Sequence, residues 1–146
     1  MKKSTVLILL IVFLGSVLVV GIFGLRSVPY EKLVYAKEIV PTSVTTMLDT
    51  KKLPIKEEVN DKGERYYYVV VPYEENLTLL INYRLTPADC TNKTVRVSIV
   101  YPTSNPPATI GDKNSIVFNR KGSVHLLYST TDSASGPTMD FWIYTY

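Results

Sequence analysis

The sequence predicts an all-β domain, an antiparallel β-sandwich of immunoglobulin-like or jelly-roll-like type with seven or eight strands, preceded by one N-terminal transmembrane helix. Three observations support this class. An uncharged, strongly apolar segment lies near the amino terminus. The remainder of the chain alternates apolar and polar residues, and turn-forming residues interrupt the alternation at short intervals. These intervals are too short for the crossover helices that a parallel sheet requires.

The apolar segment comprises residues 6–25, which carry no charge and include sixteen Leu, Ile, Val or Phe residues. A helix of this length rises about 30 Å, the thickness of a bilayer's hydrocarbon core. On an insertion scale, sixteen such side chains contribute about −5 to −10 kcal/mol. We therefore expect a transmembrane helix at residues 6–25, after a short cytoplasmic tail at residues 1–5, with the lipid bilayer as a partner.

A cleaved signal peptide is the alternative for the same segment. Lys2 and Lys3 would form its basic region, and cleavage would follow Gly21 or Gly24. The apolar run is longer than the usual 7–15 residues or so of a signal peptide, and neither cleavage site has small residues at both required positions. The uncleaved anchor is therefore the favoured interpretation.

The charges beside the anchor predict its orientation. Lys2 and Lys3 lie on the amino-terminal side, and the positive-inside rule places such residues in the cytoplasm. Residues 26–146 would then form an extracytoplasmic domain, which makes the chain a single-pass membrane protein.

The strands of this domain are expected where apolar or β-branched residues recur at every second position. The expected strands are 32–40, 55–59, 66–71, 77–86, 94–101, 115–119, 123–129 and 139–146. Residues 60–63, with the sequence Asn-Asp-Lys-Gly, predict a hairpin turn before the tyrosine-rich strand. Residues 43–52 are the one stretch considered for a helix, although they are short and rich in threonine.

The side chains expected in the core share one face of three strands. They are Leu79, Ile81, Tyr83, Val95, Val97, Ile99, Leu126 and Tyr128.

The composition excludes some partners and allows one modification. After residue 25, fourteen Lys and Arg residues stand against thirteen Asp and Glu residues, and this near-neutral balance argues against nucleic acid. The single cysteine, Cys90, cannot form an intramolecular disulfide. Asn76 and Asn92 each begin an Asn-x-Thr sequon, so both are candidates for glycosylation.

Residues suited to catalysis or metal binding are few. His125 is the only histidine and is expected on the solvent face of its strand, whereas blue-copper and tetrahedral zinc sites need several such ligands. Cys90 follows Asp89, whose charge opposes formation of a thiolate. An inert thiol is favoured over an intermolecular disulfide. We expect no enzyme activity, no cofactor and no metal site. The substitutions His125→Ala and Cys90→Ser are therefore expected to leave the biological role of the protein intact.

Aromatic residues are abundant, with eleven tyrosines and one tryptophan. They are concentrated in the tyrosine-rich strand and in the terminal strand, which is expected to be apolar on both faces and could lie at a sheet edge. The predicted partner-interface residues are Trp142, Tyr144, Tyr146, Tyr66 and Tyr68. The alternative is that these rings only cover the sheet of their own subunit.

These observations predict a non-catalytic, membrane-anchored β-sandwich that acts as a structural or accessory subunit of a membrane or cell-envelope assembly. Its partners would be other protein subunits, of the same or a different chain. Two alternatives stay open: a self-assembling protomer of a surface filament or coat that exchanges a strand such as 32–40, and a stand-alone adhesive or ligand-binding surface module.

Overall fold

The computed structural model describes residues 2–24, 32–100, 104–131 and 136–146. Its contacts divide the chain into two units, residues 1–32 and residues 33–146. Among the described residues, the first contains one helix, and the regular elements of the second are strands and a single 3₁₀ turn.

The helix α1 (Lys3–Gly24) is apolar around its whole circumference. Its large side chains from Val6 to Val20 are all exposed, and the Ser16 hydroxyl donates to the carbonyl oxygen of Phe13 at 2.8 Å. In length and composition the helix is sufficient to cross a membrane. It begins before the predicted segment 6–25, and residue 25 lies outside the described residues.

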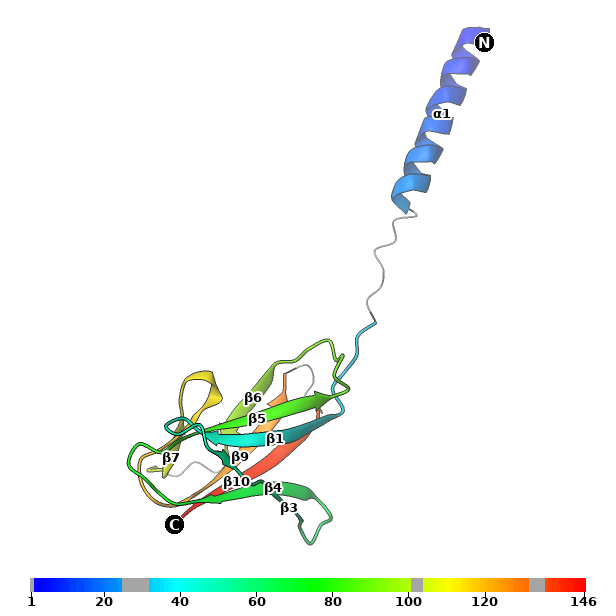
Figure 1. The fold of residues 1–146 in the computed structure, drawn as a ribbon. Helices are drawn as coiled ribbons and strands as arrows, with labels where there is room; N and C mark the ends of the chain where they lie inside the picture. Colours follow the sequence, from blue (N-terminus) through cyan, green and yellow to red (C-terminus); the bar gives the residue numbers. More distant parts are fainter. Residues whose placement is uncertain (1, 25–31, 101–103, 132–135) are drawn as a thin grey trace. The chain divides into compact units, whose positions relative to one another are not determined.

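Ten strands among the described residues form two five-stranded sheets (Figure 1). Sheet A has the order β2 (Lys52–Leu53), β1 (Glu38–Thr46), β5 (Thr78–Thr86), β8 (Ile116–Phe118), β7 (Ala108–Ile110). Sheet B has the order β3 (Lys56–Val59), β4 (Arg65–Val71), β10 (Thr138–Thr145), β9 (Ser123–Thr130), β6 (Val95–Ile99). Neighbouring strands are antiparallel except β4 and β10, which are parallel. The 3₁₀ turn η1 (Asp112–Asn114) connects β7 to β8.

One apolar core contains residues from both sheets, among them Val44 and Phe118 from sheet A and Val69 and Phe141 from sheet B. The predicted strand faces are confirmed. Six of the eight predicted core residues are buried: Leu79, Ile81, Val95, Val97, Leu126 and Tyr128. Tyr83 and Ile99 are partly buried and pack against the same core.

The predicted hairpin at residues 60–63 is confirmed, since β3 and β4 are antiparallel neighbours on either side of it. Gly63 has a φ of +78°, which glycine adopts without the steric cost of a side chain. The Asn60 side-chain oxygen accepts from the backbone N–H groups of Lys62 and Glu64, both at 2.9 Å. This turn fixes the pairing of β3 with β4.

The structure corrects the start of the domain. The first strand is β1 rather than residues 32–40, and it continues through Pro41 because the pairing with β5 shifts register between Pro41 and Ser43. A proline has no N–H to donate, so an irregularity of this kind accommodates it. The helix considered at residues 43–52 is absent: β1 ends at Thr46, a turn follows at residues 47–49, and β2 begins at Lys52.

The terminal strand is not at a sheet edge. Figure 1 shows β10 between β4 and β9, and Trp142 is paired with Tyr68 on one side and with His125 on the other. The neighbour of β10 on one side is the tyrosine-rich strand β4. Strands β2 and β7, of two and three residues, are too short to show alternation and were not predicted. Residue 101, expected in the strand 94–101, lies outside the described residues.

Candidate functional site

The solvent-facing side of sheet B carries most of the aromatic side chains predicted for an interface. Residues alternate along a strand, so the burial of Tyr67 and Phe141 directs their neighbours outward. We name this surface the aromatic face. It consists of Tyr66 and Tyr68 on β4, Asp140, Trp142 and Tyr144 on β10, and His125 on β9.

The rings of the aromatic face contact one another in a chain. His125 stacks on Trp142 with 4.2 Å between ring centroids and 6° between planes, and Trp142 is parallel to Tyr144 at 5.9 Å. Tyr68 meets Tyr144 edge to face at 6.0 Å and 79°. Aromatic pairs at such separations add about 0.5–1.5 kcal/mol beyond their buried area. The rings therefore hold one another in place, while Tyr144 remains 38% exposed.

Glu58 on β3 fixes the two outward-facing tyrosines of β4. Its carboxylate accepts hydrogen bonds from the Tyr66 hydroxyl at 2.5 Å and from the Tyr68 hydroxyl at 2.9 Å. These hydrogen bonds lower the pKa of Glu58 below its ordinary value, and the same contact raises the pKa of Tyr66 to about 12. Near neutral pH the ionised Glu58 carboxylate therefore accepts hydrogen bonds from both protonated phenols.

His125 faces solvent, as predicted, and pairs with a carboxylate. Its Nε2 atom lies 2.7 Å from Oδ1 of Asp140, and Trp142 covers the ring. The pair positions the imidazole against the indole. Within residues 2–24, 32–100, 104–131 and 136–146, no three His, Cys, Asp or Glu side chains are grouped to hold a metal ion.

The β3–β4 hairpin and the aromatic face together line an open groove of about 350 Å³, which we name the hairpin groove. Asn60, Glu64 and Arg65 come from the hairpin. The remaining lining residues belong to the aromatic face: Tyr66, His125, Asp140, Trp142 and Tyr144. The Asn60 amide donates to Glu64 at 2.8 Å, and the Arg65 Nε atom lies 3.0 Å from a Glu57 carboxylate oxygen.

The structure thus brings together four of the five predicted interface residues, Trp142, Tyr144, Tyr66 and Tyr68. Tyr146 is 64% exposed, but its hydrogen bonds are made by its backbone, with Val71 and Tyr73. Sequence reasoning missed the participation of His125, Asp140 and the hairpin. The sequence does contain one signal of this site, the two-residue spacing within each aromatic pair. This spacing places Tyr66 with Tyr68, and Trp142 with Tyr144, on one face of a strand.

The two sequons differ in their surroundings. Asn76 is exposed in the turn before β5, with a φ of +62°. Asn92 is half-buried; its side-chain amide donates to the Thr131 hydroxyl at 3.0 Å, and its side-chain oxygen accepts from the Thr94 N–H at 2.9 Å.

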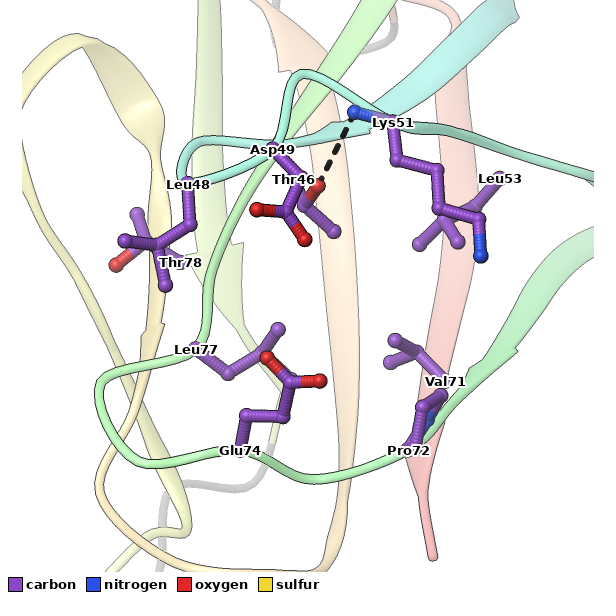
Figure 2. Close-up of a pocket in the computed structure, with 10 residues that line it drawn as sticks. All are labelled: Thr46, Leu48, Asp49, Lys51, Leu53, Val71, Pro72, Glu74, Leu77 and Thr78. Carbon is purple, nitrogen blue, oxygen red and sulfur yellow. Dashed lines mark hydrogen bonds between the residues drawn. The ribbon is translucent and has the colours of Figure 1, made fainter.

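A second, smaller hollow lies between the β1–β2 turn and the segment that joins β4 to β5 (Figure 2). Leu53, Val71 and Leu77 contribute apolar walls, and the carboxylates of Asp49 and Glu74 point into it. Its volume is about 80 Å³, which accommodates a few water molecules and is below the range of about 300–1,000 Å³ typical of ligand pockets. The aromatic face is the better candidate site.

No protein-family model matches the chain, and no curated protein matches it at a significant level. The functional argument therefore depends on the site itself.

Proposed function

We propose that this chain is a single-pass membrane protein whose β domain acts outside the cytoplasm as a non-catalytic accessory subunit of a membrane or cell-envelope assembly. The observation that carries the proposal is the aromatic face, because Trp and Tyr are enriched among the residues that dominate binding energy at protein interfaces. The apolar length of α1 supports the anchor, and Lys2 and Lys3 favour a cytoplasmic amino terminus.

The two sheets differ in what they present to solvent, which supports sheet B as the binding side. The outer positions of sheet A are mostly polar and include Ser43, Thr45, Asn82 and Arg84, with the Asn82 amide donating to Ser43 at 3.1 Å. Sheet B presents the aromatic face instead. Because β10 is paired on both sides, we expect the partner to pack on side chains rather than to add a strand to β10.

The order of the strands supports an immunoglobulin-like rather than a jelly-roll-like sandwich. An immunoglobulin domain has the strand orders A-B-E-D and C-F-G in its two sheets. Here β1-β5-β8-β7 corresponds to A-B-E-D, and β6-β9-β10 corresponds to C-F-G. In this interpretation β2, β3 and β4 are inserted between the first two strands of that plan. The hairpin groove is built on this insertion.

The test compares the full-length protein with the variant Trp142→Thr, Tyr144→Thr, Tyr146→Thr, which keeps β propensity and removes aromatic area. Both are extracted from their native membrane in a mild detergent and analysed by size-exclusion chromatography. The wild type should elute with other protein chains. The variant should keep its circular dichroism spectrum and elute alone.

The matched control is Asn82→Ala with Arg84→Ala on the outer side of sheet A, which should leave the elution position unchanged. A complex that survives the threonine substitutions would contradict the aromatic face as the interface. A wild type that forms a homopolymer would support the filament alternative, and a monomeric wild type would support the stand-alone module.

A further inference from the structure

The hairpin groove combines aromatic rings with an excess of negative charge. Tyr66, Trp142 and Tyr144 line it beside the carboxylates of Glu64 and Asp140. In the groove and directly beside it, three carboxylates stand against two basic side chains. The carboxylates are Glu58, Glu64 and Asp140, and the basic side chains are Lys56 and Arg65.

Both basic side chains already have partners. Arg65 lies 3.0 Å from a carboxylate oxygen of Glu57 and 3.7 Å from one of Glu38. The Lys56 ammonium lies 5.7 Å from the centre of the Tyr68 ring. Because Arg65 is paired with two carboxylates outside the groove, Lys56 is the cation that remains of these two against Glu58, Glu64 and Asp140, and the groove keeps a net negative charge.

We propose that the hairpin groove receives an arginine side chain of the partner protein. This inference rests on the proposed function and names the chemistry of the partner. A guanidinium is planar, stacks on aromatic rings and donates several hydrogen bonds to carboxylates. The rings of Tyr66, Trp142 and Tyr144 match its shape, and the carboxylates of Glu64 and Asp140 match its charge. Glu58 contributes to the same negative field while it holds Tyr66 in place.

The rigidity of the groove favours binding. The stacked rings of His125, Trp142 and Tyr144 and the two hydrogen bonds to Glu58 order the side chains before a partner arrives. A preorganised site avoids the entropic cost of immobilising these side chains on association.

The experiment uses the full chain in an uncharged detergent and titrates it with N-acetyl-arginine amide. Trp142 is the only tryptophan in the protein, so its emission reports the groove directly. The emission should change saturably. N-acetyl-citrulline amide has a neutral group of similar shape in place of the guanidinium, and it should bind about tenfold more weakly. Added salt should weaken binding of the arginine probe.

Variants locate the binding. Asp140→Asn and Glu64→Gln keep the shape of each side chain and remove its charge, so each should weaken binding of the arginine probe several-fold. Arg96→Ala, at an exposed position on β6, is the matched control and should bind as the wild type does. Equal binding of the two probes, or an affinity unchanged by both charge-removing variants, would overturn the proposal.

The outcomes separate this inference from the proposed function. If the threonine variant loses its partner while the arginine probe does not bind, the aromatic face remains the interface and the arginine inference fails. If the probe binds with the expected charge dependence while the wild type is monomeric in its membrane extract, the accessory-subunit proposal fails and the groove remains a guanidinium site.

Discussion

The hydroxyl groups of Tyr66 and Tyr68 share one acceptor, Glu58, and this determines how the aromatic face responds to pH. The pKa of Tyr66 is raised from its usual 10.0 to about 12, so its contribution to stability is complete below pH 10 and is lost as the pH rises through 12. The pKa of Glu58 is lowered from 4.5, so its contribution is present above that pH and is lost as the pH falls below it.

Glu58→Gln should therefore return the pKa of Tyr66 towards 10, because the charged acceptor that favours the phenol is removed. The measurement is the tyrosinate absorbance of the wild type and of Glu58→Gln over alkaline pH. In each background the titration of a Tyr66→Phe variant is subtracted, which isolates Tyr66. An unchanged Tyr66 titration after loss of Glu58 would contradict the hydrogen bond as the cause.

The Cys90 side chain is 2% exposed, and its sulfur lies 3.5 Å from the carbonyl oxygen of Asn92. We predict that a thiol reagent modifies it in the native protein no faster than the domain unfolds, because the reagent cannot reach a buried sulfur. Reaction progress curves at increasing urea concentration test this. Rapid modification without urea would show an accessible thiol and would favour the intermolecular disulfide.

Strands β9 and β10 form the centre of sheet B and should be its most sensitive elements. Leu126→Ala and Ile143→Ala remove fully buried side chains and should each lower the free energy of unfolding by about 2–5 kcal/mol. Arg96→Ala on the exposed side of β6 should change it by no more than about 0.5 kcal/mol. Urea unfolding followed by Trp142 emission measures both, and equal costs at buried and exposed positions would contradict the strand faces.

Much at the element scale could be predicted because period-two alternation records which face of a strand is buried. It correctly separates Leu126 and Tyr128 from His125 on β9. Alternation does not record which strands are neighbours, so the central place of β10 was not foreseen. A strand of two or three residues, such as β2 or β7, has too few positions to alternate.

For the candidate site, too, the sequence predicts which side chains share a face of one strand but not which strands are neighbours. The spacing of Tyr66 and Tyr68, and of Trp142 and Tyr144, places each pair on one face of its own strand. The contact of His125 with Trp142 depends on the register between β9 and β10, which is set by packing across the whole sheet. Sequence periodicity within one strand carries no information about that register.

For the whole molecule, helix α1 leads to a direct prediction. We expect α1 to remain attached in the mature protein, because its apolar residues favour the bilayer and the candidate cleavage sites lack paired small residues. Intact mass and N-terminal sequencing of protein extracted from its native membrane should show that residues 6–25 are retained. A start at Ile22 or Leu25 would establish a signal peptide instead.

The position of β10 between β4 and β9 also constrains the order in which the domain folds. Strands β4 and β10 are paired although about 70 residues separate them in the chain, so a long loop must close before sheet B is complete. The β3–β4 hairpin is synthesised much earlier than β10, and a two-stranded hairpin alone is only marginally stable in water. Until residues 138–145 pair with it, β4 lacks its neighbour on one side, and we expect this tyrosine-rich strand to be open to pairing with other chains while synthesis is incomplete.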